Sequence, residues 1–356
     1  MKNKIQIGFI GLALAAIFLV VAAPASAVDF AISGQVNRAV MYADDGKSAK
    51  WFFVDNDNSS TRFRFRGSND FENNWKVGFL WEVEMQSNAS NEVSMSDDSD
   101  LGPVDFNERH MEVWIERWGR LRLGQGDTAS NGTSEVDLSG TAVAAYSSVG
   151  DVGSSFEFRD GDDKIGITVG GSRSNFDGLS RKDRIRYDTP RWAGFFASGS
   201  VEGNSEWDVA ARYASDFGWA RFAAAAGWAD FGTSSDAKDG TRDGSFSSSA
   251  SILFDFGLNF TASYAFRKQD DTDPWNLFGK IGYQFLKKHA ASIQYSRTKN
   301  LTAKDDKGDS FGIGYVFTPW ESVEFYGTYY LHMLDRDEGS DPDDINIVMA
   351  GMRVRF

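Results

Sequence analysis

The chain has 356 residues, with 37 Lys and Arg, 51 Asp and Glu and a formal net charge of -14 at pH 7. This acidic balance disfavours binding to nucleic acid, because phosphates attract basic surfaces. The chain contains no cysteine, which excludes a disulfide scaffold, a thiol nucleophile and a thiolate metal site.

The N-terminal segment has the pattern of a secretory signal peptide. Lys2 and Lys4 precede an apolar run from Ile5 to Ala23, and small residues follow up to Ala27. This order predicts a signal peptide over residues 1–27 and one mature domain over residues 28–356. Beyond residue 27 no run of about 18 apolar residues occurs, so we expect no further membrane helix.

Apolar and polar residues alternate along most of the remaining chain. From Trp75 to Gln86 the odd positions are large and apolar, and the even positions are mostly polar or small. This period of two is typical of strands whose two faces meet different surroundings. It predicts sixteen strands, near residues 29–43, 60–68, 75–86, 106–117, 120–125, 184–188, 195–201, 206–215, 219–230, 245–254, 257–268, 277–286, 290–298, 310–317, 322–333 and 344–356.

The connections between these strands alternate between two classes. Those in one class are short, and the others are mostly longer and rich in Asp, Gly and Ser, as in the segment from Asp335 to Asp344. Tight turns at one end and long polar loops at the other are typical of an antiparallel barrel in an outer membrane. Tryptophans suited to a membrane interface lie in or beside the short turns: Trp75, Trp118, Trp192, Trp219 and Trp320.

The third long connection, from about residue 126 to 183, is much longer than the others and is expected to fold into the lumen. Within it, the segments that begin at Ser154 and Lys164 have the pattern of a hairpin. This hairpin either decorates the loop or adds two strands to the wall. We expect a transmembrane antiparallel β-barrel of sixteen strands, with eighteen as the alternative.

Arginine and phenylalanine alternate in TRFRFRG, which begins at Thr61. Successive side chains of a strand point to opposite faces. If the phenylalanines face lipid, the arginines face the lumen, because each cation against hydrocarbon would cost about 2–4 kcal/mol near the midplane. The strand near 184–188 alternates in the same way. The residues expected to line a water-filled lumen are Arg62, Arg64, Arg66, Arg184 and Arg186.

The last strand ends on Phe356, and Val348, Ala350, Met352 and Val354 share a face before it. Together with TRFRFRG, the stretch from Glu108 through LGQGD at Leu123, and DRIRYDTPRWAGF from Asp183, this end resembles the general diffusion porins of Gram-negative outer membranes. The PEFGG-like segment that many of these porins carry in the third loop is absent from the chain.

The resemblance implies an outer-membrane channel for passive diffusion of small hydrophilic solutes and ions, which assembles as a homotrimer among lipid and lipopolysaccharide. It places the trimer contact near residues 29–43, 60–68 and 75–86. It also implies a constriction with a basic side formed by Arg62 and Arg184, with Arg109 as a further candidate. Acids of the third loop would face them, and we select Glu135, Asp137 and Asp151.

Other functions remain open at this point. A channel specific for a sugar or an anion would have the same strand pattern, and an outer-membrane enzyme is a further alternative. The three histidines, His110, His289 and His332, show no nucleophile-and-base arrangement in the sequence. No cofactor is expected, except that the acidic outer loops could bind structural Ca²⁺, because hard cations prefer clustered carboxylates.

Overall fold

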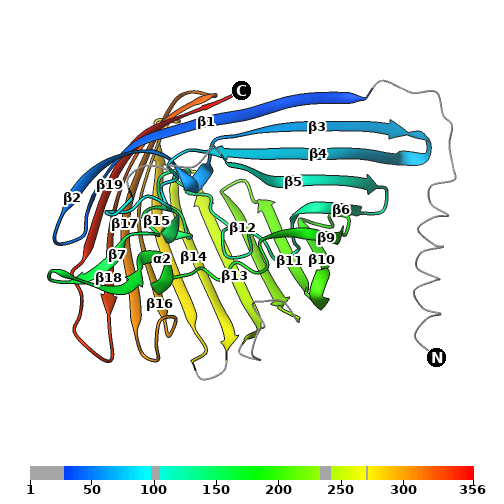
Figure 1. Ribbon diagram of the computed structural model, residues 1–356. Helices are drawn as coiled ribbons and strands as arrows, with labels where there is room; N and C mark the ends of the chain where they lie inside the picture. Colours follow the sequence, from blue (N-terminus) through cyan, green and yellow to red (C-terminus); the bar gives the residue numbers. More distant parts are fainter. Residues whose placement is uncertain (1–27, 98–104, 233–241, 270–271) are drawn as a thin grey trace, which may run out of the picture.

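The computed structural model describes residues 28–97, 105–232, 242–269 and 272–356. The predicted signal peptide, residues 1–27, lies outside these residues. Figure 1 shows a wall of long strands with short connecting segments and a long inner excursion between β6 and β9. Within the described residues, no helix is long and apolar enough to cross a membrane.

The strands in chain order are β1 (Asp29–Asp44), β2 (Ala49–Asp55), β3 (Arg62–Phe71), β4 (Trp75–Gln86), β5 (Asp105–Glu116), β6 (Arg120–Asp127), β7 (Glu157–Asp160), β8 (Asp163–Thr168), β9 (Arg181–Asp188), β10 (Phe195–Glu202), β11 (Trp207–Asp216), β12 (Ala220–Asp230), β13 (Arg242–Phe254), β14 (Leu258–Gln269), β15 (Trp275–Phe285), β16 (His289–Lys299), β17 (Lys307–Trp320), β18 (Val323–Asp335) and β19 (Ile345–Arg355). The short helical segments are η1 (Asp57–Ser59), η2 (Glu72–Asn74), η3 (Val149–Asp151), α2 (Val169–Ser172) and η4 (Gly203–Ser205).

The wall is a closed antiparallel barrel. Its sheet contains 17 described strands, and β1 pairs with β19 to close the circle. Strands β2 and β3 lie end to end, since β1 pairs with β2 through Arg38 and Asp55 and with β3 through Gln35 and Arg62. Counting this pair as one position gives sixteen strands around the wall, which confirms the predicted number.

The hairpin of the third loop is separate from the wall. Strands β7 and β8 pair only with each other, in a sheet of two strands. The alternative of eighteen wall strands is therefore wrong, because this hairpin decorates the loop.

Strand β2 occupies a stretch that we expected to be an outer loop. Trp51 and Phe53 face outward and are 68% and 69% exposed, whereas Phe52 and Val54 are buried. Because both faces are apolar here, the polar positions that mark a period of two are missing. Segment η1 then interrupts the wall before β3 begins.

The outward face of the barrel is apolar. Val113, Leu123 and Ile281 are 55%, 53% and 47% exposed, whereas the intervening side chains point into the barrel. Large exposed side chains on a wall of this kind are stable only against hydrocarbon. Four of the turn tryptophans, Trp118, Trp192, Trp219 and Trp320, are also strongly exposed.

The inside of the barrel is not uniformly polar. At the loop end of β1, β2, β18 and β19 a cluster of buried apolar side chains packs against the third loop. Phe156 meets Phe52 edge to face at 5.5 Å between ring centroids, and Ile345 and Ile347 are fully buried. Part of the interior is therefore a dry core under the hairpin, where the prediction of a wet inner face does not hold.

The chain end seals the barrel beside β1. The backbone N–H of Gly34 donates to the carbonyl of Phe356 at 2.9 Å, and the N–H of Phe356 donates to the carbonyl of Gly34 at 3.0 Å. A Cβ atom on Gly34 would lie 2.7 Å from Cζ of the Phe356 ring and 2.6 Å from the carbonyl oxygen of Arg62. The closure therefore requires a glycine at position 34, because a side chain there would overlap its neighbours.

We predict that Gly34→Ala lowers the free energy of unfolding by about 1–3 kcal/mol, because a methyl group overpacks this contact. Urea titration of the protein in lipid vesicles, followed by tryptophan fluorescence, measures this change. Gly199→Ala is the matched control, since its Cβ would be 3.8 Å from the nearest atoms. Equal stability of the two variants would contradict the packing of Phe356 over Gly34.

Candidate functional site

The third loop, residues 128–180, is fastened to the inner face of the wall. Asp208 of β11 accepts hydrogen bonds from the backbone N–H of Ala129 at 3.0 Å and of Ser130 at 2.7 Å. On β13, Ser249 Oγ accepts from the N–H of Val136 at 2.9 Å. An irregular backbone away from water must find such partners. The wall side chains therefore determine the path of the loop.

A buried ion pair holds the middle of the loop. Lys280 Nζ of β15 lies 2.7 Å from Asp137 Oδ2 and donates to the carbonyl of Ala145 at 2.5 Å. The side chain of Lys280 is fully buried. Gly314 of β17 leaves room for the loop, since a Cβ atom there would lie 2.7 Å from Cβ of Ala145.

An irregularity between β4 and β5 brings two consecutive side chains into the barrel. The register shifts between Glu82 and Val83, so Arg109 is an extra residue in β5. A β-bulge of this kind re-aims side chains. Arg109 Nη1 lies 2.6 Å from Glu84 Oε1, and His110 Nδ1 lies 3.6 Å from Glu82 Oε1.

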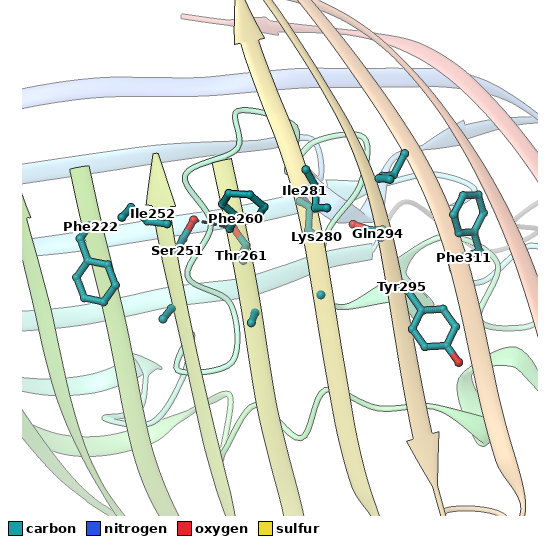
Figure 2. A pocket seen from close by; sticks show the side chains of 14 residues that line it. Phe222, Ser251, Ile252, Phe260, Thr261, Lys280, Ile281, Gln294, Tyr295 and Phe311 are labelled. Atoms are coloured by element: carbon teal, nitrogen blue, oxygen red, sulfur yellow. Dashed lines mark hydrogen bonds between the residues drawn. The ribbon is translucent and has the colours of Figure 1, made fainter. Parts of the chain in front are cut away.

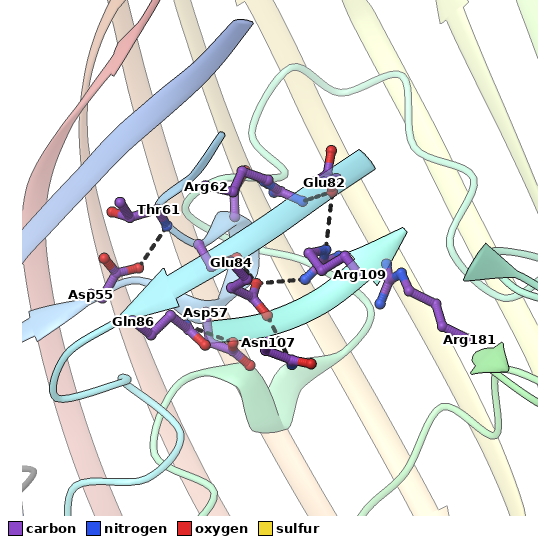
Figure 3. A network of polar contacts seen from close by, with 12 residues as sticks. Asp55, Asp57, Thr61, Arg62, Glu82, Glu84, Gln86, Asn107, Arg109 and Arg181 are labelled. Atoms are coloured by element: carbon purple, nitrogen blue, oxygen red, sulfur yellow. Dashed lines mark hydrogen bonds and ion pairs between the residues drawn. The ribbon is translucent and has the colours of Figure 1, made fainter. Parts of the chain in front are cut away.

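The two glutamates of β4 join the arginines of the neighbouring strands, as Figure 3 shows. Arg62 Nη1 of β3 lies 3.5 Å from Glu82 Oε1, and Arg109 Nε lies 3.3 Å from the same atom. Next to this network, Gln86 Nε2 donates to Asp57 Oδ1 at 2.9 Å. The paired charges fix the arginine side chains on one wall of an open space.

That space is a cavity of about 610 Å³ between the wall and the third loop. Among the described residues, five arginines line it: Arg62, Arg109, Arg181, Arg267 and Arg353. Four carboxylates also line it, three of which belong to the third loop: Asp57, Glu135, Asp151 and Asp177. The cavity is therefore a polar space lined by charges of both signs.

Four of the residues predicted for the constriction line this cavity together: Arg62, Arg109, Glu135 and Asp151. Arg64 and Arg66 face the interior and are exposed there, with Arg64 in an ion pair with Glu82. Neither belongs to the cavity lining. On the outward face, as the alternation requires, the ring of Phe65 stacks on that of Trp81, with 5.4 Å between centroids. It also stacks on the ring of Phe30, with 6.1 Å between centroids.

The structure places the other three predicted residues away from the cavity: Arg184 and Arg186 lie behind the start of the loop, and Asp137 of the loop itself points to the wall. Arg184 is buried against Glu112 and donates to the carbonyls of Gly124 and Asp127 at 2.6 and 2.9 Å. Arg186 donates to Asp188 and to the carbonyl of Thr128. The start of the loop covers both guanidinium groups, and Asp137 is held by Lys280. These three side chains position the loop.

Sequence reasoning missed several cavity residues. Arg353 continues an alternation of arginine and apolar residues in the last strand, the same signal as TRFRFRG, and could have been found. Asp57 lies in η1, Arg181 at the first residue of β9, and Asp177 near the end of the loop. In a helical turn, at the start of a strand or in a loop, the alternation of residues does not predict which way a side chain points.

The carboxyl groups of the third loop lie close enough to raise one another's pKa values. Burial raises the pKa of the Glu135 carboxyl, and the carboxyls of Asp177 and Asp151 raise it further, while hydrogen bonds from Asn175 and Tyr146 oppose the rise. Burial also raises the pKa of Asp151, and Asp57 adds to this shift. Both side chains are partly exposed to the cavity, so water there lessens the shifts.

A closed barrel with an apolar outer face and a charged inner cavity is the architecture of an outer-membrane channel. The sequence matches the family model described as Gram-negative porin over residues 12–337. The chain belongs to this family, and it forms a water-filled outer-membrane channel for passive diffusion. A comparison with curated protein sequences finds no match.

Solved structures share the fold at low sequence identity. The anion-selective porin from Comamonas acidovorans is 18% identical, with a TM-score of 0.66, over 93% of this chain and 100% of that one. The trimer form of OmpT, an outer membrane protein of Vibrio cholerae, is 14% identical, with a TM-score of 0.58, over 93% and 100%. The outer membrane channel DcaP of Acinetobacter baumannii is 12% identical, with a TM-score of 0.59, over 92% and 97%.

We predict that lowering the pH from about 8 to about 5.5 increases the permeability of anions relative to cations. Glu135 and Asp151 have raised pKa values, so they take up protons in a range where ordinary carboxyls, with pKa values of about 4, stay ionised. The arginines keep their charge. Reversal potentials in a KCl gradient measure the shift, and Glu135→Gln should reduce it. A reversal potential that is constant over this range would contradict the prediction.

Proposed function

We propose that solutes pass through the cavity between the arginines of the wall and the acids of the third loop, and that this cavity is the constriction of the channel. The observation that supports it is that Arg62 and Arg109 of the wall and Glu135 and Asp151 of the loop line one space of about 610 Å³. Fixed charges of opposite sign on the two sides of a narrow passage create a transverse field. Small hydrophilic solutes keep favourable polar contacts there, whereas apolar solutes disturb the ordered water.

A preference for anions is the second candidate. The lining holds five arginines and four carboxylates, and the raised pKa values of Glu135 and Asp151 reduce the negative charge further near neutral pH. The net charge of the whole chain does not oppose this preference, because the field inside the passage depends on the nearest groups. The similar structure from Comamonas acidovorans is described as an anion-selective porin.

We predict that Arg62→Gln combined with Arg109→Gln lowers the anion-to-cation permeability ratio at least about twofold, since two charges within several ångströms of the path are removed. Reversal potentials of single channels in planar bilayers measure this ratio. Arg66→Gln is the matched control, because Arg66 faces the interior outside the cavity lining. An equal change of the permeability ratio in the control, or no change in the double variant, would contradict the proposed constriction.

We propose that the protein carries out no catalysis. Among the residues that the structure describes, one pair resembles a nucleophile and its base: Ser310 Oγ lies 2.8 Å from His332 Nδ1. Both residues are buried, and His332 Nε2 lies 3.2 Å from the carbonyl of Val152 in the third loop. A substrate has no route to this serine, so the pair serves to hold the loop. His110 is likewise engaged, between Glu82 and Asp127.

We also propose a homotrimer, with contacts on the outward faces of β1, β3 and β4. Phe30, Phe65 and Trp81 form a contiguous stack of rings there. Aromatic side chains are enriched in subunit contacts. The similar OmpT structure is described as a trimer form.

We predict that Phe65→Ser combined with Trp81→Ser reduces the trimer fraction, because the change removes two rings from this surface. Native mass spectrometry of the detergent-solubilised protein measures the fraction. Leu123→Ser, on the outward face of β6, is the control. A trimer fraction equal to that of the control would contradict the assigned contact.

Binding of Ca²⁺ by the acidic outer loops stays a prediction. In the part of the chain that the structure describes, no group of three His, Asp or Glu residues has the placement of a metal site.

A further inference from the structure

A small polar chamber lies beside the cavity of the channel and is bordered mainly by residues of the third loop. Its volume is about 150 Å³, and a cavity of this size holds a molecule of about six non-hydrogen atoms. The chamber and the cavity share four lining residues, which are Ser148, Asp151, Ser174 and Asn175. A solute in the cavity is therefore next to the chamber.

The guanidinium group of Arg173 lines the chamber as a buried cation, since the residue is 4% exposed. Nη1 donates to the carbonyl of Val169 at 3.2 Å, and Nη2 donates to the carbonyls of Asp309 at 3.2 Å and Met333 at 2.9 Å. The carboxylate of Asp309 is paired with Arg297 instead. Nε has no hydrogen-bond partner among the described residues. Burying a cation without an opposite charge is costly, so the chamber favours an anionic group at this side chain.

Other residues of the lining need a hydrogen-bond donor. Asn276 of β15 is 1% exposed, and its Nδ2 donates to Ser296 Oγ at 3.0 Å and to Thr298 Oγ1 at 2.9 Å. Its Oδ1 has no partner within the described part of the chain, and the same is true of Asn91 Oδ1 and Ser147 Oγ. A buried polar atom without a partner is destabilising. The chamber therefore combines an unpaired cation with unpaired hydrogen-bond acceptors.

The wall holds the loop segment that carries Ser147 in a fixed position. Lys280 of β15 and Gln294 of β16 pair in register, and Figure 2 labels both. Lys280 Nζ donates to the carbonyl of Ala145 at 2.5 Å, and Gln294 Nε2 donates to that of Tyr146 at 3.1 Å. A lining that is fixed in advance loses little conformational entropy when a ligand binds. The chamber is therefore a preformed site.

We infer that the chamber binds one small α-amino acid of about the size of glycine or alanine, with its carboxylate at Arg173 and its ammonium group at Asn91 and Asn276. A guanidinium group binds a carboxylate through charge-assisted hydrogen bonds. An ammonium group has three donors and no acceptor, which suits the amide oxygens. Asp151 also lines the chamber, so a ligand that carries both charges suits the lining. The amino acid enters from the cavity through which solutes pass, so the site rests on the proposed function in that respect.

Water and a simple anion are less suitable occupants. Water satisfies the unpaired acceptors but does not compensate the charge of Arg173. Chloride or acetate compensates that charge but offers no donor to Asn91 and Asn276. Both occupants are outcomes of the test.

The test is equilibrium dialysis of the whole protein, purified in detergent, against radiolabelled glycine. The expected result is saturable binding of one glycine per chain, which acetate displaces at least about tenfold more weakly than alanine does, because acetate lacks the ammonium group. Absence of saturable binding would show that water fills the chamber. Equal displacement by acetate and alanine would show a site for simple anions. Either result would overturn the inference.

Two variants with matched controls locate the site. Arg173→Met should weaken glycine binding at least about tenfold, whereas Arg66→Gln, which removes a charge outside the chamber, should bind like the original chain. Ser147→Val adds a methyl group at a hydroxyl that has no partner among the described residues and should also weaken binding. Its control is Ser263→Val on β14, where another buried hydroxyl has no described partner and lies outside the chamber lining. Unchanged affinity in both Arg173→Met and Ser147→Val would overturn the site.

Glycine binding is measured without a current, so it is independent of the permeability ratio. Absence of binding, together with the expected change of that ratio in the Arg62→Gln and Arg109→Gln double variant, would overturn the chamber and leave the proposed constriction standing. Binding with an unchanged ratio would support the chamber and contradict the constriction. Circular dichroism of each variant confirms that the barrel has folded.

Discussion

The structure depends on one constraint: a chain in hydrocarbon must pair every backbone N–H and C=O group with another part of itself. A sheet meets this constraint only when its edges join, and here β1 and β19 join them. Phe356 completes the seam by exchanging two hydrogen bonds with Gly34. Once the wall is closed, its backbone is satisfied, and all functional variation is left to side chains and connecting segments.

The third loop must also pair its backbone N–H and C=O groups, but it does so with side chains of the wall. Its backbone is irregular, so it cannot form a ladder with the wall, and inward side chains such as Asp208 and Ser249 accept its N–H groups instead. Charged residues inside the barrel consequently have two roles. Lys280 is fully buried and holds the loop, whereas Arg62 and Arg109 remain beside open space and set the local field. A charged side chain that the loop covers holds the loop in place, whereas one that borders the cavity influences the field there.

The sequence was sufficient to predict the strand number, the sorting of turns and loops, and the lumen-facing side of TRFRFRG, because a period of two is a direct record of which face a residue occupies. It was insufficient for β2, where both faces are apolar, and for the bulge that turns Arg109 inward. Periodicity also says which residues face inward without saying what covers them. For this reason Arg184, Arg186 and Asp137 were grouped with Arg62, although the loop covers the two arginines and Asp137 is held by Lys280 of the wall.

Because the third loop is attached to many strands, the shape of the cavity depends on the barrel as a whole. Ser249, Asp208 and Lys280 stand on three different strands, and none of them lines the cavity. Substitutions at these wall positions can consequently change the size or shape of the cavity while every residue that lines it stays the same. Two chains with identical pore linings could then differ in the molecules they admit.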